Sequence, residues 1–506
     1  MKPMIGAALL AASLVPVHAA QGINPAQLTQ AINQLATQAQ QQITAGNVPG
    51  LAVAVVHQGR LVYSKGYGVR EAGKAGLVST DTVFQLASLS KPVGATVVAA
   101  LVAEGKISWD SKLNLLDPGF ALQDPWVTRE ITVRDMYSHR SGLPAHAGDA
   151  IEDLGYDGAE VIHRLRYQKA VSSFRSTYAY TNFGLTAAGV AAARAYGLDW
   201  ATASEQKLYK PLGMWTASSR FSDFMAKADK ALGHVRQGDK WVHTVQRNPD
   251  AQSPAGGVSA SVSDLSKWML YQLAQAGKNP SLDETHHPHM LTGFGHGTGL
   301  PNFYGLGWGV NYDEAGRLRL SHSGGFAMGA STRVILLPSE QLGVIVLTNV
   351  PPVGVAEGLA QNFVDTTLYG KPTQDWLALF RQVFSQGSAI GLLPVSDFSK
   401  PPTVTTPPLA NDAYIGRYGN NPLFGEAVIS EQAGQLVLTF AQQKVAYPLR
   451  HYQRDTFTYD TIGENAVGPA GVTFTIGSDG KASEVSIENL SATGQGVFRR
   501  SAKAGQ

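Results

Sequence analysis

The stretch "FQLASLSKPVGATVVAALVAEG", Phe84 to Gly105, carries the strongest signal for fold and chemistry in this chain. Ser88 stands three positions before Lys91, at the start of an apolar run that ends at Gly105. Residues three apart lie on one face of a helix, so the two side chains can meet. Pro92 fits this placement, because proline is tolerated in the first turn of a helix. The spacing predicts a helix that begins at a serine–lysine pair.

Such a pair has a chemical use. A serine hydroxyl is a weak nucleophile and needs a base. Lysine serves as that base only when burial or a nearby cation lowers its pKa from the ordinary value of about 10.4. The start of a helix also offers free N–H groups to a developing oxyanion. Ser-x-x-Lys is short and occurs by chance, so a solvated helix face is the alternative interpretation of the motif alone.

Two later motifs change that balance. In "SFRSTYAYTNFGLTAAG", Tyr180 stands two positions before Asn182, and in an extended segment both project to the same side. The tyrosine can relay a proton and the amide can bind a carbonyl; the alternative is a packed tyrosine before a helix capped by Asn182. In "LRLSHSGGFAMG", the glycines of His322–Gly325 allow a substrate backbone to lie close to a strand. A hydrogen-bonded strand histidine is the alternative for His322.

These motifs, in this order, resemble the serine β-lactamase and penicillin-binding-protein superfamily, and more narrowly the class C β-lactamase-related serine hydrolases. That group includes D-aminopeptidases, D-Ala-D-Ala carboxypeptidases, class C β-lactamases and β-lactamase-like esterases. The phrases "ITVRDMYSHRSGLP", from residue 131, and "YGLGWGV", from residue 304, add to the resemblance, which runs roughly from Ile43 to Tyr369. It implies an α/β (α+β) fold with an antiparallel sheet covered by helices, and a reaction that needs no metal or other cofactor.

The resemblance also implies roles for individual residues. Ser88 matches the acylated nucleophile and Lys91 its base. Tyr180 matches the tyrosine that assists proton transfer, and Asn182 the asparagine that binds the substrate amide. Tyr178 is the alternative to Tyr180 as the tyrosine of the Tyr-x-Asn motif. If Tyr178 were that tyrosine, Tyr180 would stand where the motif has its asparagine, so Tyr180 is preferred.

The third motif departs from that of true β-lactamases. His322, Ser323 and Gly324, the expected substrate contacts, stand where the family has Lys-Thr-Gly or His-x-Gly, and the N–H groups of Ser88 and Gly325 are the expected oxyanion hole. Class C β-lactamases carry the lysine form, whose permanent charge suits a substrate carboxylate, whereas histidine is mostly neutral at pH 7. This favours a peptidase or esterase acting on D-amino-acid peptides, peptidoglycan-like fragments or small esters. The alternatives are a class C-type β-lactamase and, from another class, a protein that binds penicillins or cell-wall fragments without turnover.

The N-terminus has the features of an export signal. Lys2 precedes an apolar run, Met4 to Val17, and small residues come after it. We expect residues 1–19 to be a signal peptide and the mature protein to be soluble, periplasmic or secreted, without a transmembrane anchor. The chain has no cysteine, which excludes a cysteine nucleophile and thiolate metal sites. Its net charge is +2 without a long basic run, so we expect a small-molecule or short-peptide substrate and no nucleic-acid partner. The oligomeric state is left open.

Periodicity and composition divide the rest of the chain. We expect a β-lactamase-like hydrolase domain over residues 20–390, a linker rich in proline and threonine over 391–411, and a domain of short strands over 412–503. The last resembles the lipocalin-like β-barrel often appended to these hydrolases. Its five tyrosines are interpreted as core and rim residues rather than a ligand stripe: Tyr414, Tyr418, Tyr447, Tyr452 and Tyr459.

Four other features are given structural or solvent-exposed interpretations. We interpret His139 as structural and the acidic pair Glu152-Asp153 as solvated. The cluster "HHPHM", which contains His286, His287 and His289, lacks an accompanying His-Glu-x-x-His and is expected to be a solvated loop rather than a metal site. The surrounding stretch, Glu284 to Pro301, is expected to form a flexible rim of the site.

Overall fold

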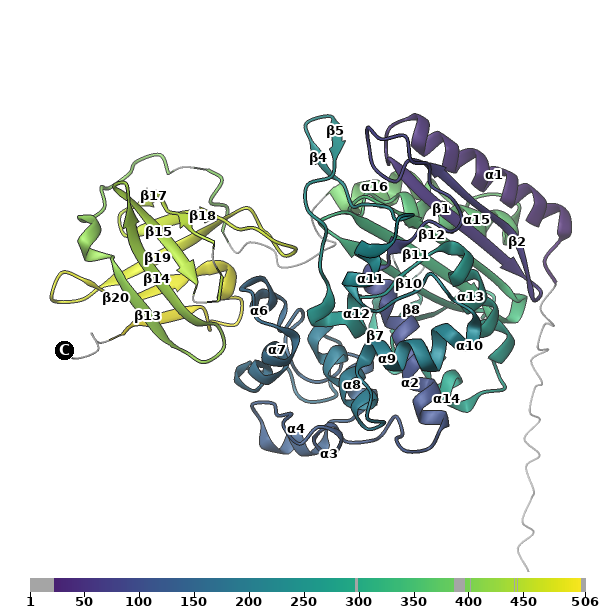
Figure 1. Cartoon of the computed structure of the whole chain (residues 1–506), viewed down its shortest axis with the longest axis horizontal. Helices are drawn as coiled ribbons and strands as arrows, with labels where there is room; N and C mark the ends of the chain where they lie inside the picture. Colours follow the sequence, from purple (N-terminus) through teal and green to yellow (C-terminus); the bar gives the residue numbers. More distant parts are fainter. Residues whose placement is uncertain are drawn as a thin grey trace, which may run out of the picture.

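The computed structural model describes residues 22–295, 299–385, 396–400, 402–440, 442–443 and 445–501. The expected signal peptide and part of the expected linker lie outside these residues, and the expected domain boundaries stay predictions. A larger unit of helices and sheet lies beside a smaller unit built of strands (Figure 1). The α/β (α+β) fold expected from sequence, an antiparallel sheet covered by helices with a C-terminal β-barrel, is confirmed. Within the described part of the chain, no helix has the length and apolar character needed to cross a membrane.

An eight-stranded antiparallel sheet forms the centre of the larger unit, in the order β2-β1-β12-β11-β10-β9-β8-β7. Its strands are β1 (Gly50–His57), β2 (Arg60–Gly68), β7 (Met290–Phe294), β8 (Pro301–Tyr304), β9 (Gly309–Tyr312), β10 (Leu318–Phe326), β11 (Ala330–Leu337) and β12 (Leu342–Thr348). Strand β1 pairs with β12, with Val53 opposite Val346. The two ends of this unit are therefore joined in one sheet, while the intervening chain supplies most of its helices.

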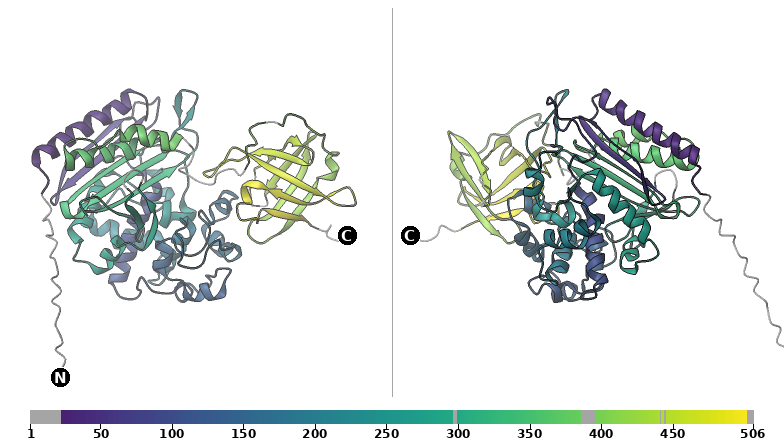
Figure 2. Two further views of the ribbon diagram at one scale, coloured as in Figure 1. Left: turned by 180° about the vertical axis from the view of Figure 1, so that it is seen from behind. Right: turned by 45° about the vertical axis from the view of Figure 1, so that its right-hand side comes forward.

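Three helices cover one face of the sheet: α1 (Pro25–Thr44), α15 (Val355–Tyr369) and α16 (Trp376–Ser385). From behind, the purple α1 and the green helices lie together against this face (Figure 2). Alternate residues of β1 and β12 point toward them and form an apolar core with the inner faces of α1 and α15. Helix α1 begins at Pro25, directly after Asn24, whose side chain accepts a hydrogen bond from the backbone of Ala26.

The opposite face carries the longer helices α2 (Ser90–Ala103), α8 (Asn182–Arg194) and α13 (Val262–Gln275). Helix α2 has apolar residues on all sides, which is typical of a buried helix, and most of its residues are buried. In this core the rings of Trp268 and Trp308 stack with centroids 5.5 Å apart. The shorter helices are α3 (Leu113–Leu116), α4 (Pro125–Glu130), α5 (Val133–Tyr137), α6 (Asp149–Asp153), α7 (Gly158–Arg164), α9 (Trp200–Ser204), α10 (Lys210–Leu212), α11 (Phe221–Ala226), α12 (Ser253–Gly256) and α14 (Pro280–Asp283).

The smaller unit is a nearly closed antiparallel barrel of nine strands, in the order β16-β15-β14-β13-β21-β20-β19-β18-β17. They are β13 (Gly416–Asn421), β14 (Gly425–Gln432), β15 (Gln435–Phe440), β16 (Tyr447–Pro448), β17 (Arg450–Gln453), β18 (Thr456–Asp460), β19 (Pro469–Ile476), β20 (Ala482–Ile487) and β21 (Val497–Arg500). Four of the five tyrosines are buried in its core, as expected, with Tyr452 less so.

Two expectations of solvated segments are wrong. In the histidine cluster, His286 is buried with Nε2 at 3.0 Å from Gln272 Oε1, and His289 Nε2 lies 3.1 Å from the carbonyl oxygen of Glu284. His287 is exposed, as expected, and the next segment along the chain contains the edge hairpin β7–β8. Glu152 is also buried, because Arg247 reaches it from a distant segment and pairs with it at 2.7 Å. Neither contact is visible in the local sequence.

Candidate active site

Ser88 lies in a tight turn, η1 (Ala87–Leu89), between the short strand β3 (Phe84–Gln85) and α2. Ala87 has φ of +49°, a left-handed conformation that costs energy in a residue with a Cβ atom. The surrounding chain holds the turn on two sides: Leu86 donates from its backbone to Val258 at 2.9 Å, and its carbonyl accepts from Thr332 Oγ1 at 2.8 Å. The serine is thus presented on a constrained turn rather than on a regular helix face.

Lys91 lies buried beneath Ser88, as the three-residue spacing predicted. Its Nζ has three oxygen neighbours: Ser88 Oγ at 3.0 Å, Asn182 Oδ1 at 2.7 Å and the carbonyl of Ala255 at 3.1 Å. Burial lowers the pKa of Lys91 to about 7, while the nearby charge of Asp149 acts in the opposite direction. An amine with that pKa is neutral for a large fraction of the time at neutral pH, so it can accept a proton from Ser88.

Tyr180 joins this pair from the extended segment before α8. Its ring lies over Lys91, with Nζ 4.5 Å from the centroid. Burial raises the pKa of Tyr180 well above its usual value, and a hydrogen bond with Ser88 only partly opposes this. The group is therefore a neutral hydroxyl that can pass a proton on. Tyr178 also lines the cleft but packs against His139 and Tyr304, with centroids 5.7 and 5.4 Å away.

Asn182 is the first residue of α8, and its side chain connects Lys91 to a buried carboxylate. Its Nδ2 donates to Asp149 Oδ2 at 2.8 Å, while His146 Nδ1 lies 2.9 Å from the same oxygen. Asp149 begins α6 after Gly148, which has φ of +99°. The sequence analysis missed Asp149 and His146, because "AHAGDA" has no motif spacing relative to Ser88; the left-handed glycine before an acidic residue is the only local signal.

His322 is a neutral residue of β10. Its Nδ1 lies 2.5 Å from the carbonyl of Ser323, and its Nε2 lies 2.9 Å from the hydroxyl of Tyr304. Burial, with a further contribution from Lys91, lowers the pKa of His322 to about 3. Nδ1 therefore carries the proton and donates to Ser323, which leaves Nε2 to accept from Tyr304. The motif position that is a permanent cation in a Lys-Thr-Gly sequence is uncharged here.

The end of β10 passes close to the turn of Ser88. Strand β9 pairs with β10 as far as Ser321, and the residues beyond pack against η1. A Cβ atom on Gly324 would lie 2.2 Å from the carbonyl oxygen of Leu86, so only glycine fits at this approach. Ser323 points to the other side, where it donates to Glu357 Oε1 at 3.0 Å and accepts from Arg333 at 3.1 Å. Arg333 and Glu357 were not predicted from sequence.

These groups surround one cleft of about 450 Å³. Seven of the eight predicted site residues line it and Lys91 lies beneath its floor. The seven are Ser88, Tyr180, Asn182, His322, Ser323, Gly324 and Gly325. Further lining residues come from positions that were not predicted, among them His146, Asp149, Tyr178, Gln252, Tyr304, Arg333, Glu357, Glu464 and Asn465. Two of these, Glu464 and Asn465, belong to the barrel.

The chain matches two family models and several curated sequences. The family model described as Beta-lactamase matches residues 32–363, and one described as a domain of unknown function, DUF3471, matches residues 400–499. "Unguisins hydrolase ungD'" of Aspergillus campestris is 25% identical over 489 residues, covering 88% of this chain and 87% of that protein. "Protein flp" of Staphylococcus aureus is 23% identical over 318 residues, covering 62% of each.

Solved structures share the fold. The octameric penicillin-binding protein homologue from Pyrococcus abyssi is 19% identical with a TM-score of 0.60, and the alignment covers 90% of this chain and 98% of that one. A class C beta lactamase from Rhodobacter sphaeroides is 22% identical with a TM-score of 0.55, covering 66% of this chain and 99% of that one. At these identities the likeness concerns the fold.

The contact between Asn182 and Asp149 predicts a measurable effect on Lys91. In Asp149→Asn the hydrogen bond to Asn182 can persist but the negative charge is lost, so the pKa of Lys91 should fall below about 7, by about one unit. NMR titration of protein labelled at lysine Cε measures this directly. Asp239→Asn, in an exposed turn, is the control and should leave the titration unchanged. An unchanged or raised pKa in Asp149→Asn would contradict the assignment.

Proposed function

Since this chain belongs to the beta-lactamase family of serine hydrolases, we propose that it cleaves amide or ester bonds through an acyl-enzyme on Ser88. The observation that carries the proposal is the position of Lys91. Its amine lies 3.0 Å from the serine hydroxyl, and burial lowers its pKa to about 7. A base with a pKa near the working pH is the arrangement that general-base catalysis requires.

Acylation proceeds through these contacts. Neutral Lys91 takes the proton of Ser88 Oγ, and the oxygen attacks the carbonyl carbon of the substrate. The oxyanion is stabilised by the N–H groups of Ser88 and Gly325, at the close approach of β10 to the serine turn. When the tetrahedral intermediate collapses, the bond to the leaving amine or alcohol breaks, and Tyr180 relays a proton from Lys91 to that group. Asn182, fixed by Asp149, binds the amide of the substrate.

Deacylation uses the same groups in reverse. Water attacks the acyl carbon, and its proton passes through Tyr180 to Lys91. The bond between Ser88 Oγ and the acyl carbon then breaks, Oγ regains a proton from Lys91, and a carboxylic acid leaves. Because Tyr180 and Lys91 are both neutral at the start of each half-reaction, one proton circulates and no cofactor takes part in these steps.

The electrostatics of the cleft favour uncharged peptide or ester groups. His322 is neutral, and the positive charge of Arg333 lies beside the buried carboxyl of Glu357 rather than standing alone. The cleft therefore lacks the unpaired lysine charge that suits the carboxylate of a β-lactam. We favour D-amino-acid peptides, peptidoglycan-like fragments or small esters as substrates. The similarity to a protein named as a hydrolase of unguisins supports hydrolysis as the activity.

The N-terminal segment sets the proposed location. We propose that residues 1–19 direct export and that the mature protein works in the periplasm or outside the cell on small molecules or short peptides. Nucleic acid is not a proposed partner, given the net charge of +2.

Active-site labelling tests the nucleophile. A fluorophosphonate should add to the parent protein but not to Ser88→Ala, because only an activated serine attacks the probe. Intact-mass measurement and turnover of a short-chain nitrophenyl ester give the readouts, with Ser483→Ala, on the barrel surface, as the matched control. Equal labelling of parent and Ser88→Ala would refute the assignment. Labelling of the parent without ester turnover would point instead to a binding protein.

The pKa of Lys91 predicts the pH dependence. The reactive form is the neutral amine, so kcat/KM for the ester should rise with pH through a limb near pH 7 and level off above it. The rate rises with pH because protonation below this pKa removes the base. A pH–rate profile measures it, and a rate that falls as pH rises through 7 would contradict the role of Lys91.

A substrate comparison separates peptidase or esterase from β-lactamase. With neutral His322, we expect kcat/KM for nitrophenyl esters or D-alanyl anilides to exceed that for a chromogenic cephalosporin by about tenfold or more. The Ser88→Ala protein provides the background for each substrate. Faster hydrolysis of the cephalosporin would support the β-lactamase alternative.

A further inference from the structure

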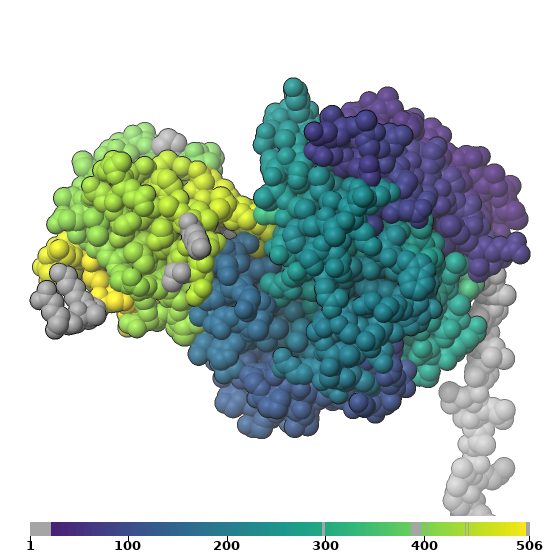
Figure 3. All heavy atoms as spheres, in the orientation of Figure 1, coloured from purple at the N-terminus to yellow at the C-terminus, as the bar shows by residue number. Residues whose placement is uncertain are grey.

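A loop of the C-terminal barrel enters the cleft of the hydrolase unit. Residues 461–468 connect β18 to β19, and Glu464 and Asn465 line the same cleft as Ser88. The yellow loop reaches from the barrel toward the larger unit (Figure 1), and in the space-filling view the barrel abuts the blue segment that includes α6 and α7 (Figure 3). The cleft is therefore composite, with walls from two parts of the chain.

Glu464 holds the turn after β10. Its Oε1 accepts from the backbone N–H of Ala327 at 2.7 Å, and Oε2 accepts from Met328 at 3.4 Å. Ala327 comes directly after Phe326, the last residue of β10, and stands two positions after Gly325. A carboxylate bonded to backbone N–H groups is a strong anchor when water is excluded. The barrel thus fixes the end of the strand that carries the proposed oxyanion donor.

A cluster of buried ionisable groups connects Glu464 to the strand that precedes Ser88. Glu152, Arg247 and Glu464 are exposed by only 9, 8 and 8%, respectively. Arg247 lies 2.7 Å from Glu152 and 4.0 Å from Glu464, and its carbonyl accepts from Gln85 Nε2 at 2.8 Å. Gln85 stands three positions before Ser88. Burial raises the pKa of Glu464 to about 7, and the charge of Arg247 acts in the opposite direction. Removal of Glu464 would take away one of the two carboxyl groups beside the buried guanidinium of Arg247.

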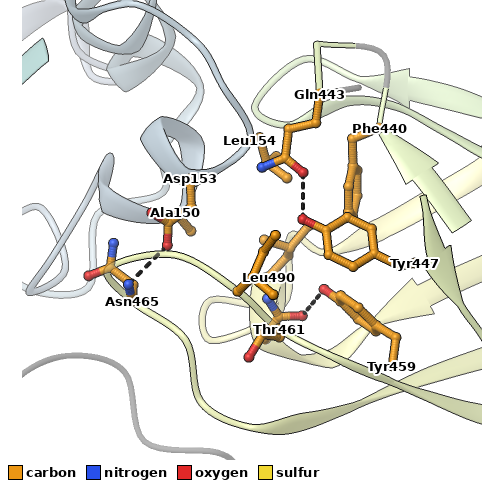
Figure 4. A pocket seen from close by; sticks show the side chains of 12 residues that line it. Ala150, Asp153, Leu154, Phe440, Gln443, Tyr447, Tyr459, Thr461, Asn465 and Leu490 are labelled. Carbon is orange, nitrogen blue, oxygen red and sulfur yellow. Dashed lines mark hydrogen bonds between the residues drawn. The ribbon is translucent and has the colours of Figure 1, made fainter. Parts of the chain in front are cut away.

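Asn465 extends the contact to the network of Lys91. Its backbone N–H donates to Asp153 Oδ2 at 3.1 Å (Figure 4), and its Nδ2 donates to the carbonyl of Asp149 at 3.4 Å. The side chain of Asp149 binds Asn182, which binds Lys91. Two residues before Asn465, Gly463 has φ of +106°, and a Cβ atom there would lie 3.1 Å from Asp153.

The loop is held in place by a wider interface. Arg164 of α7 donates to the carbonyl of Pro422 at 2.8 Å, Tyr156 donates to that of Phe424 at 3.3 Å, and Gln495 donates to that of Tyr167 at 2.8 Å. A small cavity of about 30 Å³ lies between α6 and the end of the barrel, beside Asn465 (Figure 4). Because the barrel contacts α6 and α7 at several points, the loop has a defined position in the cleft.

We propose that the C-terminal barrel is a working part of the catalytic unit. Its 461–468 loop forms a wall of the cleft, Glu464 is a positioning residue for the turn after β10, and Asn465 anchors the loop at Asp149 and Asp153. The inference rests on the proposed acyl-enzyme function, since the positioned strand matters through Gly325. It gives a role to the part of the chain that matches a domain of unknown function.

The test compares variants of the full-length protein by the rate of fluorophosphonate labelling and by kcat and KM for a nitrophenyl ester. Glu464→Ala should lower kcat and the labelling rate by about tenfold, with a smaller change in KM, because the proposed oxyanion donor is misplaced. Glu464→Gln keeps one acceptor for Ala327 and should stay within about threefold of the parent. Glu484→Ala is the matched control and should behave as the parent, because the carboxylate of Glu484 pairs with Arg499 on the barrel surface, away from the cleft.

The outcomes separate this inference from the function it rests on. If the parent is labelled at Ser88 and folded Glu464→Ala matches it in kcat and labelling rate, the positioning role is wrong and the hydrolase function stands. If the parent is not labelled, both fail. Should Glu464→Ala not fold, Gly463→Ala serves instead, because alanine is strained at a φ of +106° and its Cβ would lie 3.1 Å from Asp153, so the backbone of the loop must adjust while the carboxylate of Glu464 remains. An unchanged kcat in Gly463→Ala would likewise overturn the proposal.

Discussion

The burial of one amine is the constraint on which this site depends. Lys91 is removed from water and surrounded by three oxygen atoms, from Ser88, Asn182 and Ala255. In a protein interior the charged form of such an amine is disfavoured, and the pKa falls to about 7. Asp149 limits the fall by its charge. The balance between burial and this carboxylate decides how much of the lysine is available as a base.

The fold provides that balance by bringing distant segments together. The turn of Ser88 lies between α2 and the end of β10, where Gly324 permits a close approach that any side chain would prevent. Helix α8 presents Asn182 at its first residue, and α6 presents Asp149 at its own. Because strands from both ends of this unit pair at the centre of the sheet, the proposed catalytic groups are fixed to rigid elements. Reactive groups held in this way need little reorganisation during the reaction.

The sequence predicted those contacts that form between residues a few positions apart. The Ser88–Lys91 pair, the Tyr180–Asn182 pair and the His322–Gly325 segment each lie within a few residues, and the structure brings them together at one cleft. The sequence could not show partners that come from far along the chain without a motif. Glu152 was misinterpreted as solvated because its partners, Arg247 and Gln252, come from a distant segment and are not visible locally. His286 was misinterpreted for the same reason, since Gln272 lies on another helix.

The same limit explains why the role of the barrel emerges only in three dimensions. Glu464 and Asn465 stand in an ordinary turn between two strands, and nothing in their neighbourhood of sequence relates them to Ser88. In the structure they line the side of the cleft where Asp149 binds Asn182. Asp149 is also the carboxylate whose charge limits the fall in the pKa of Lys91. The interface that holds this loop therefore borders both the wall of the cleft and the group that adjusts the strength of the proposed base.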